Sequence, residues 1–131
     1  MIQSIHTFTY IKLGSYYRPI IPIALKEGNE IIDFPALVDS GSDFNVFPGF
    51  LADFLGINLT QVKQKQITGL SGSATSYPYA LEVGIAGKFY RAPLVFSYDT
   101  TLNNFGLLGQ VGFFDRFVVE FDQRNKVITL K

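Results

Sequence analysis

The chain has 131 residues, 47% of them hydrophobic, and its 11 basic and 11 acidic side chains leave a formal net charge of zero. This length suits a single domain over residues 1–131, and the balanced, scattered charge argues against partners such as nucleic acid or an anionic membrane. With no cysteine and one histidine, His6, the sequence excludes disulfides, thiolate metal sites and a multi-histidine metal centre within one chain.

The start of the chain is predicted to form short strands. Residues 5–13 and 20–25 are rich in β-branched and aromatic side chains. The Glu-Gly-Asn triplet at residues 27–29 predicts a hairpin turn, and residues 30–34 begin the return strand.

An apolar run and the one predicted helix follow. The run at residues 36–38, Ala-Leu-Val, stops at a turn-forming cluster at residues 39–42, Asp-Ser-Gly-Ser. Residues 48–55 predict a helix that has Pro48 in its first turn, an apolar face along its length, and Gly56 at its C-terminal cap.

The rest of the chain alternates apolar runs with turns. A tip rich in glycine and serine at residues 69–73 joins two strands, and the run at residues 107–109 ends in glycine. Further strands are expected over residues 62–68, 77–85, 89–96, 117–121 and 126–130. These elements predict one mostly β domain with one or two short helices. No apolar run approaches the roughly 20 residues of a membrane span and no signal peptide is visible, so we expect a cytoplasmic protein.

Asp39 is the unusual residue, because it directly follows a run that is expected to be buried. Carboxylates are seldom buried unless they are paired or hydrogen-bonded, so this position favours a functional role. A simpler interpretation is that Asp39 caps a turn within Asp-Ser-Gly, a triplet that occurs by chance in many proteins.

The motifs around Asp39 resemble those of the retropepsin-like, or retroviral-type, aspartic proteases over roughly residues 16–131. Residues 36–42 are similar to the family's apolar-apolar-Asp-Ser/Thr-Gly-Ala/Ser signature. Residues 62–83 resemble its flap hairpin, and Leu-Leu-Gly at residues 107–109 resembles its apolar-apolar-Gly motif. Residues 113–130 look like its closing helix and hairpin. The resemblance implies a closed acid-protease β-barrel with one lobe per chain.

The resemblance also implies a reaction, the hydrolysis of extended peptides by a water activated between two aspartates. Two carboxylates about 3 Å apart share one proton, so that one acts as general base toward the water and the other as general acid toward the carbonyl oxygen. Since the chain has one such motif, the second Asp39 must come from an identical chain. We therefore expect an aspartic endopeptidase that is active as a homodimer and needs no metal or organic cofactor.

Further site residues follow from the same resemblance. Asp39, Ser40 and Gly41 form the catalytic motif, in which Ser40 braces the two loops across the dimer and Gly41 allows close backbone approach. A Ser42 hydroxyl that donates to the Asp39 carboxylate would favour its charged form and an acidic optimum. The residues expected to bind the substrate are Ser42, Asp43, Thr68, Gly69, Leu70, Ser71, Gly72 and Leu108. The walls expected to select apolar side chains beside the scissile bond are Val38, Ile67, Leu70 and Leu108.

Two residues are expected to support the dimer, Arg18 and Gly109. The resemblance suggests an ion pair between Arg18 and Asp43 of the partner subunit; the alternative is two solvated charges that contribute less than about 1 kcal/mol. Viral members commonly have Arg after the apolar-apolar-Gly motif, whereas this chain has Gln110, which can hydrogen-bond a carboxylate but brings no charge.

Two other functions fit the sequence. A catalytically silent module with this fold would bind an extended peptide, or act in assembly, through the same backbone hydrogen bonds. An unrelated β-barrel that binds a small apolar ligand would make the Asp39 motif accidental. Residues 1–15 extend beyond the matched part, in a family whose dimers commonly pair their chain ends in a shared sheet. They are expected to add a strand to the barrel, to join the dimer interface or to block part of it.

Overall fold

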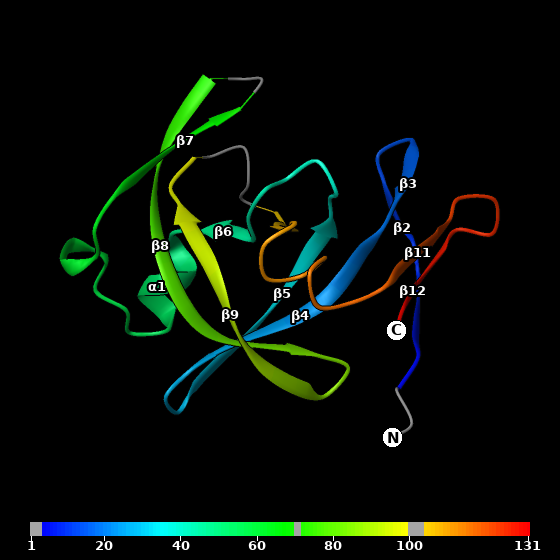
Figure 1. Cartoon of the computed structure of the whole chain (residues 1–131), viewed down its shortest axis with the longest axis horizontal. Helices are drawn as coiled ribbons and strands as arrows, with labels where there is room; N and C mark the ends of the chain where they lie inside the picture. Colours follow the sequence, from blue (N-terminus) through cyan, green and yellow to red (C-terminus); the bar gives the residue numbers. More distant parts are fainter. Residues whose placement is uncertain (1–3, 70–71, 100–103) are drawn as a thin grey trace.

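The computed structural model describes residues 4–69, 72–99 and 104–131 of a single chain, with the backbone alone at residues 66–69 and 72–74. Most of the described residues lie in strands, and their helical elements are α1 (Phe50–Phe54) and a short 3₁₀ helix, η1 (Leu59–Gln61) (Figure 1). The predicted mostly β lobe with one or two short helices is confirmed.

The body of the molecule is a seven-stranded sheet. Its strands are β4 (Ile20–Glu27), β5 (Glu30–Val38), β6 (Val46–Pro48), β7 (Lys65–Gly69), β8 (Gly72–Ile85), β9 (Lys88–Ser97) and β10 (Gly106–Leu108). They are arranged in the order β4-β5-β10-β6-β9-β8-β7, and a further antiparallel pairing between β4 and β8 closes all of them except β7 into a barrel. The closed barrel that the sequence predicted is therefore present.

The interior of this barrel is filled by the side chains of alternate strand residues. In β4 the side chains of Ile21, Ile23 and Leu25 point inward and are buried, because successive side chains of a strand face opposite sides of the sheet. The bulkiest fully buried side chains are those of Phe47, Phe96 and Phe113. Aromatic side chains of the core thus join β6, β9 and the segment after β10.

Both ends of the chain meet in a second sheet. It has the order β1-β12-β11, built from β1 (His6–Thr9), β12 (Val127–Leu130) and β11 (Val119–Asp122), all antiparallel. The N-terminal extension therefore adds a strand, but to the C-terminal hairpin and not to the barrel. β12, the last strand, is paired on both of its edges within the chain.

The remaining part of the extension is a two-stranded hairpin of β2 (Ile11–Leu13) and β3 (Tyr16–Arg18). The single strand predicted over residues 5–13 is wrong in this respect, since it breaks at Tyr10. The Tyr10 side chain is only 6% exposed, and its backbone N–H donates to the carbonyl of Lys126 at 2.7 Å. The chain changes direction between β1 and β2 at this buried residue.

The predicted helix over residues 48–55 is too long. Pro48 ends β6 and does not begin α1, because residues 46–48 pair in parallel with β9 and are buried there. Gly56 follows the helix at φ +74°, so its predicted place at the C-terminal cap is confirmed. The expected closing helix near Phe113 and Phe114 is a series of turns over residues 112–116.

Candidate active site

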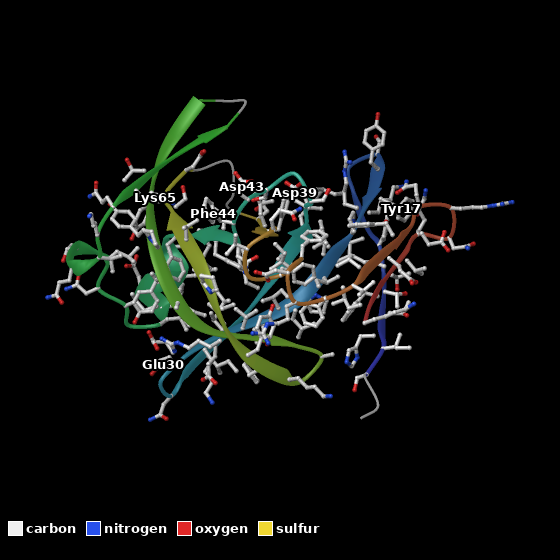
Figure 2. The ribbon with its side chains drawn as sticks, in the orientation of Figure 1. Tyr17, Glu30, Asp39, Asp43, Phe44 and Lys65 are labelled. Carbon is white, nitrogen blue, oxygen red and sulfur yellow. The ribbon has the colours of Figure 1, made fainter. Side chains whose placement is uncertain are left out.

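Asp39 stands at the end of β5, a strand that lies between β4 and β10 in the barrel. Its backbone N–H donates to the carbonyl of Leu108 at 3.0 Å, and the preceding N–H, of Val38, donates to Pro19 at 2.9 Å. The carboxylate is half-buried, and its Oδ1 accepts from the Gly41 N–H at 3.0 Å. Figure 2 shows Asp39 and Asp43 on the same loop, between the β7–β8 hairpin and the β2–β3 hairpin in that view.

The chain after β10 threads directly past this loop. The N–H groups of Gln110 and Val111 both donate, at 2.9 Å, to the carbonyls of Ser42 and Asp43. A Cβ on Gly109 would lie 2.4 Å from the carbonyl oxygen of Phe44 and 2.5 Å from that of Ser42, so only glycine fits. Gly109 thus supports the loop within one chain, and its expected support of the dimer stays a prediction.

Asn45 is a positioning residue that the sequence analysis missed. Its side chain is fully buried; Oδ1 accepts from the Gly109 N–H at 2.9 Å and Nδ2 donates to the carbonyl of Pro93 at 3.3 Å. The Asn45 amide therefore ties the loop to both β10 and β9. The available signal was a polar side chain directly before the apolar run Val46-Phe47.

Ser42 and Gln110 make contacts different from those expected. The Ser42 hydroxyl donates to the carbonyl of Phe44 at 2.7 Å, so in this chain its one proton is not directed to Asp39. The Gln110 amide donates to the carbonyl of Ser40 at 2.7 Å. Gln110 therefore braces the Asp-Ser-Gly motif without a charge. The hydrogen bond from Ser42 to Asp39, on which the hypothesis of an acidic optimum depends, is not made, because Ser42 donates to Phe44.

The β7–β8 hairpin, predicted as the flap, extends from the barrel beside this loop (Figure 1). Its register pairs Gly69 with Gly72 and Thr68 with Ser73; Leu70 and Ser71 lie outside the described residues, as does the Ile67 side chain. The hairpin is anchored at its base, where the buried Ser76 hydroxyl donates to the carbonyl of Lys65 at 2.8 Å.

Lys65 connects this hairpin to the Asp39 loop. Its ammonium nitrogen lies 4.8 Å from the centre of the Phe44 ring, a cation–π distance. Figure 2 shows the two side chains together on the side of the loop that faces the hairpin. The stem of the predicted flap therefore rests on the loop that carries Asp39 and Asp43.

The other predicted site residues differ in how far they are exposed to solvent. Leu108 and Val38 are buried in the core, at 0% and 4% exposure, so their contact with a substrate stays a prediction. Arg18 is exposed at the end of β3, with its guanidinium 5.4 Å from the centre of the Tyr16 ring, and Asp43 is exposed as well. A pair between Arg18 and Asp43 of the partner subunit also stays a prediction.

Tyr90 fixes the turn that follows Gly109. Its hydroxyl donates to the carbonyl of Gly112 at 3.2 Å, and the Arg116 guanidinium lies 4.3 Å from the centre of its ring. Burial raises the pKa of Tyr90, an effect that the charge of Arg116 opposes. The neutral phenol is therefore the form that holds this turn.

The part of the chain that the structure describes has no group of three or more potential metal-ligating side chains. Within the same residues, no helix has the length and apolar character needed to cross a membrane.

No protein-family model matches the chain, and no curated protein matches it in sequence. Solved structures do match. A retropepsin-like aspartic protease from Rickettsia conorii superposes with a TM-score of 0.74 at 19% identity, covering 98% of this chain and 100% of that one. The protease of EIAV, complexed with the inhibitor HBY-793, superposes with a TM-score of 0.53 at 15% identity, covering 76% of this chain and 88% of that one. The chain therefore has the retropepsin-like fold that its motifs predicted.

Proposed function

We propose that this chain is one subunit of a homodimeric aspartic endopeptidase. The observation that carries the proposal is the place of Asp39: a half-exposed carboxylate at the end of a barrel strand, in a loop tied by backbone hydrogen bonds to Leu108, Gln110 and Val111. A carboxylate held in this way is pre-organised, because its position does not have to be created when a substrate binds. The fold shared with known aspartic proteases supports the same proposal.

The reaction needs two such carboxylates. Asp39 and Asp39 of the partner subunit face each other across a two-fold axis and hold one proton between them, since like charges at such a distance do not both ionise. The ionised carboxylate removes a proton from a water as the water oxygen attacks the peptide carbonyl carbon, and the protonated carboxyl donates to the carbonyl oxygen. Proton transfer to the amide nitrogen then releases the amine, and the C–N bond breaks.

The substrate is proposed to be an extended peptide between the Asp39 loop and the β7–β8 hairpin. Backbone groups near Asp43 on one side, and the hairpin backbone from Thr68 to Gly72 on the other, would pair with the peptide as a strand pairs with a sheet. Leu70 and Ser71 at the hairpin tip would close over it, and the contact between Lys65 and Phe44 supports this placement. Arg18 would pair with Asp43 of the partner subunit.

The test is cleavage of a mixed peptide library between pH 3 and pH 7, with and without pepstatin, by wild type and by Asp39→Asn. We expect pepstatin-sensitive cleavage that falls by at least about 10²–10⁴-fold in the variant, the range of a lost general acid–base pair. Asn can still accept from the Gly41 N–H, so the thermal unfolding of Asp39→Asn should match that of wild type.

A confirmed dimer that cleaves nothing at any pH would contradict this proposal. It would favour the second candidate, a peptide-binding or assembly module that uses the same cleft without turnover.

A further inference from the structure

The β2–β3 hairpin exposes an unusual amount of apolar surface. All six of its strand residues are exposed, and Ile11, Leu13 and Tyr16 are 45%, 43% and 67% accessible. The register pairs Leu13 with Tyr16 and Ile11 with Arg18, which places these side chains on one face of the ribbon. A two-stranded hairpin is marginally stable alone in water, so an apolar face of this kind favours a covering partner.

The chain ends leave little room for the dimer sheet expected from the resemblance. β12 already pairs with β1 on one edge and with β11 on the other, along all four of its residues. A partner strand therefore cannot pair with the C-terminal strand unless β1 or β11 is displaced. Pairing between two copies through this sheet is therefore restricted to the outer edges of β1 and β11, and any further contact has to lie outside the sheet.

The hairpin lies beside the position that a second copy must approach. It leads through Pro19 into β4, where Ile20 pairs with Leu37, and the Pro19 carbonyl accepts from the Val38 N–H at 2.9 Å. Asp39 directly follows Val38. With about 3.3 Å per strand residue, the backbone of Tyr16 lies on the order of 10 Å along the chain from that of Pro19. A copy that brings its Asp39 to this Asp39 therefore comes within reach of the hairpin.

The charges of the two segments also favour a second copy of the chain as the partner of the hairpin. Residues 11–18 carry two cations, Lys12 and Arg18, and no acid, whereas residues 39–43 carry two acids, Asp39 and Asp43, and no base. A two-fold axis presents the same two surfaces twice, so the hairpin of each copy meets an acidic loop. Such complementarity within one chain is what a self-associating surface requires.

We propose that the apolar face of the β2–β3 hairpin, Ile11, Leu13 and Tyr16, is a dimer contact that docks against a second copy beside its Asp39 loop. The proposal rests on the proposed homodimeric function, and it adds a contact that lies apart from the chain ends. In this arrangement the hairpin couples assembly to catalysis, because it holds the second carboxylate in place.

The test compares Leu13→Ser/Tyr16→Ser with wild type by sedimentation velocity over a range of concentrations. Phe54→Ser is the matched control, since Phe54 is 68% exposed on α1, at the opposite side of the view in Figure 1. We expect the double variant to raise the dimer dissociation constant roughly tenfold or more and to lower cleavage at low protein concentration. Phe54→Ser should change neither, and thermal unfolding of all three proteins at equal monomer fraction should agree.

Cross-linking gives a second measurement, because the sequence has no cysteine. Leu13→Cys copies mixed with Asp43→Cys copies should give, with a bis-maleimide, a covalent dimer joined between residues 13 and 43, whereas Phe54→Cys copies mixed with Asp43→Cys copies should not. The proposal is overturned if the double variant dimerises as tightly as wild type, or if wild type is monomeric at all concentrations and the hairpin therefore serves another partner. A wild-type dimer that depends on the hairpin but cleaves nothing supports this interface and contradicts the proposed enzyme.

Discussion

Two neighbouring segments of this molecule differ sharply in how they are held. The Asp39 loop, residues 39–45, is bonded to the chain after β10 through Ser42, Asp43 and the buried Asn45. The β2–β3 hairpin is joined to the same region through Pro19, but its strands pair only with each other. One segment is fixed by its own chain, and the other presents six exposed residues to solvent.

The difference agrees with the two proposals made above. If Asp39 is catalytic, its carboxylate has to be positioned before a substrate arrives, and a loop held by many hydrogen bonds and close packing meets that requirement. If the hairpin face binds a second copy, it has to stay accessible in the single chain. Substitutions in the loop should therefore change the stability of the single chain, whereas substitutions on the hairpin face should change association.

The largest effect is expected at Gly109. In Gly109→Ala the new methyl group meets two backbone carbonyls, of Phe44 and Ser42, which cannot rotate away as a side chain would. We expect a loss of about 3 kcal/mol or more in the free energy of unfolding, measured by urea denaturation, together with a loss of cleavage. Gly28→Asn is the control, because its site is open and Asn tolerates its φ of +59°. A variant as stable as wild type would show that the loop is not held in this way.

A smaller effect is expected at Asn45. Asn45→Ala leaves the buried Gly109 N–H without its acceptor and removes the donor to the part-buried Pro93 carbonyl, which should lower the free energy of unfolding by about 1–3 kcal/mol. Cleavage should fall as well, since the loop loses its link to β9 and β10. The exposed Asn29→Ala, in the β4–β5 turn, should stay within about 0.5 kcal/mol of wild type. Equal losses in both variants would contradict the bracing role.

The smallest effect concerns Tyr90 and pH. Burial raises the pKa of Tyr90 above its ordinary value of 10, so the folded state holds this proton more tightly than the unfolded state. Its contribution to stability is therefore complete below about pH 10 and is lost as the pH rises through the folded-state pKa. Tyr90→Phe should cost about 1 kcal/mol at pH 7, for the lost bond to Gly112, and should flatten the decline above pH 10. A decline in Tyr90→Phe identical to that of wild type would contradict the assignment.

Particular residues show where sequence reasoning succeeded. The strand at residues 20–25, the turn at residues 27–29 and the apolar run before Asp39 all appear as predicted, because local residue preferences and turn chemistry decide them. Pro48 was assigned to a helix because its local preference suits a first turn. The pairing of residues 46–48 with β9, far away in the sequence, overrode that preference.

The sequence by itself determined a single mostly β lobe, the position of Asp39 after a buried strand, and the absence of cysteine chemistry. Only the tertiary structure decided that Asn45 binds Gly109, that Ser42 donates to Phe44 instead of Asp39, and that β1 occupies the free edge of β12. The physical reason is the sequence separation between the residues that interact. Strands and turns follow from neighbours a few residues apart, whereas these contacts join atoms whose approach depends on how the whole barrel closes.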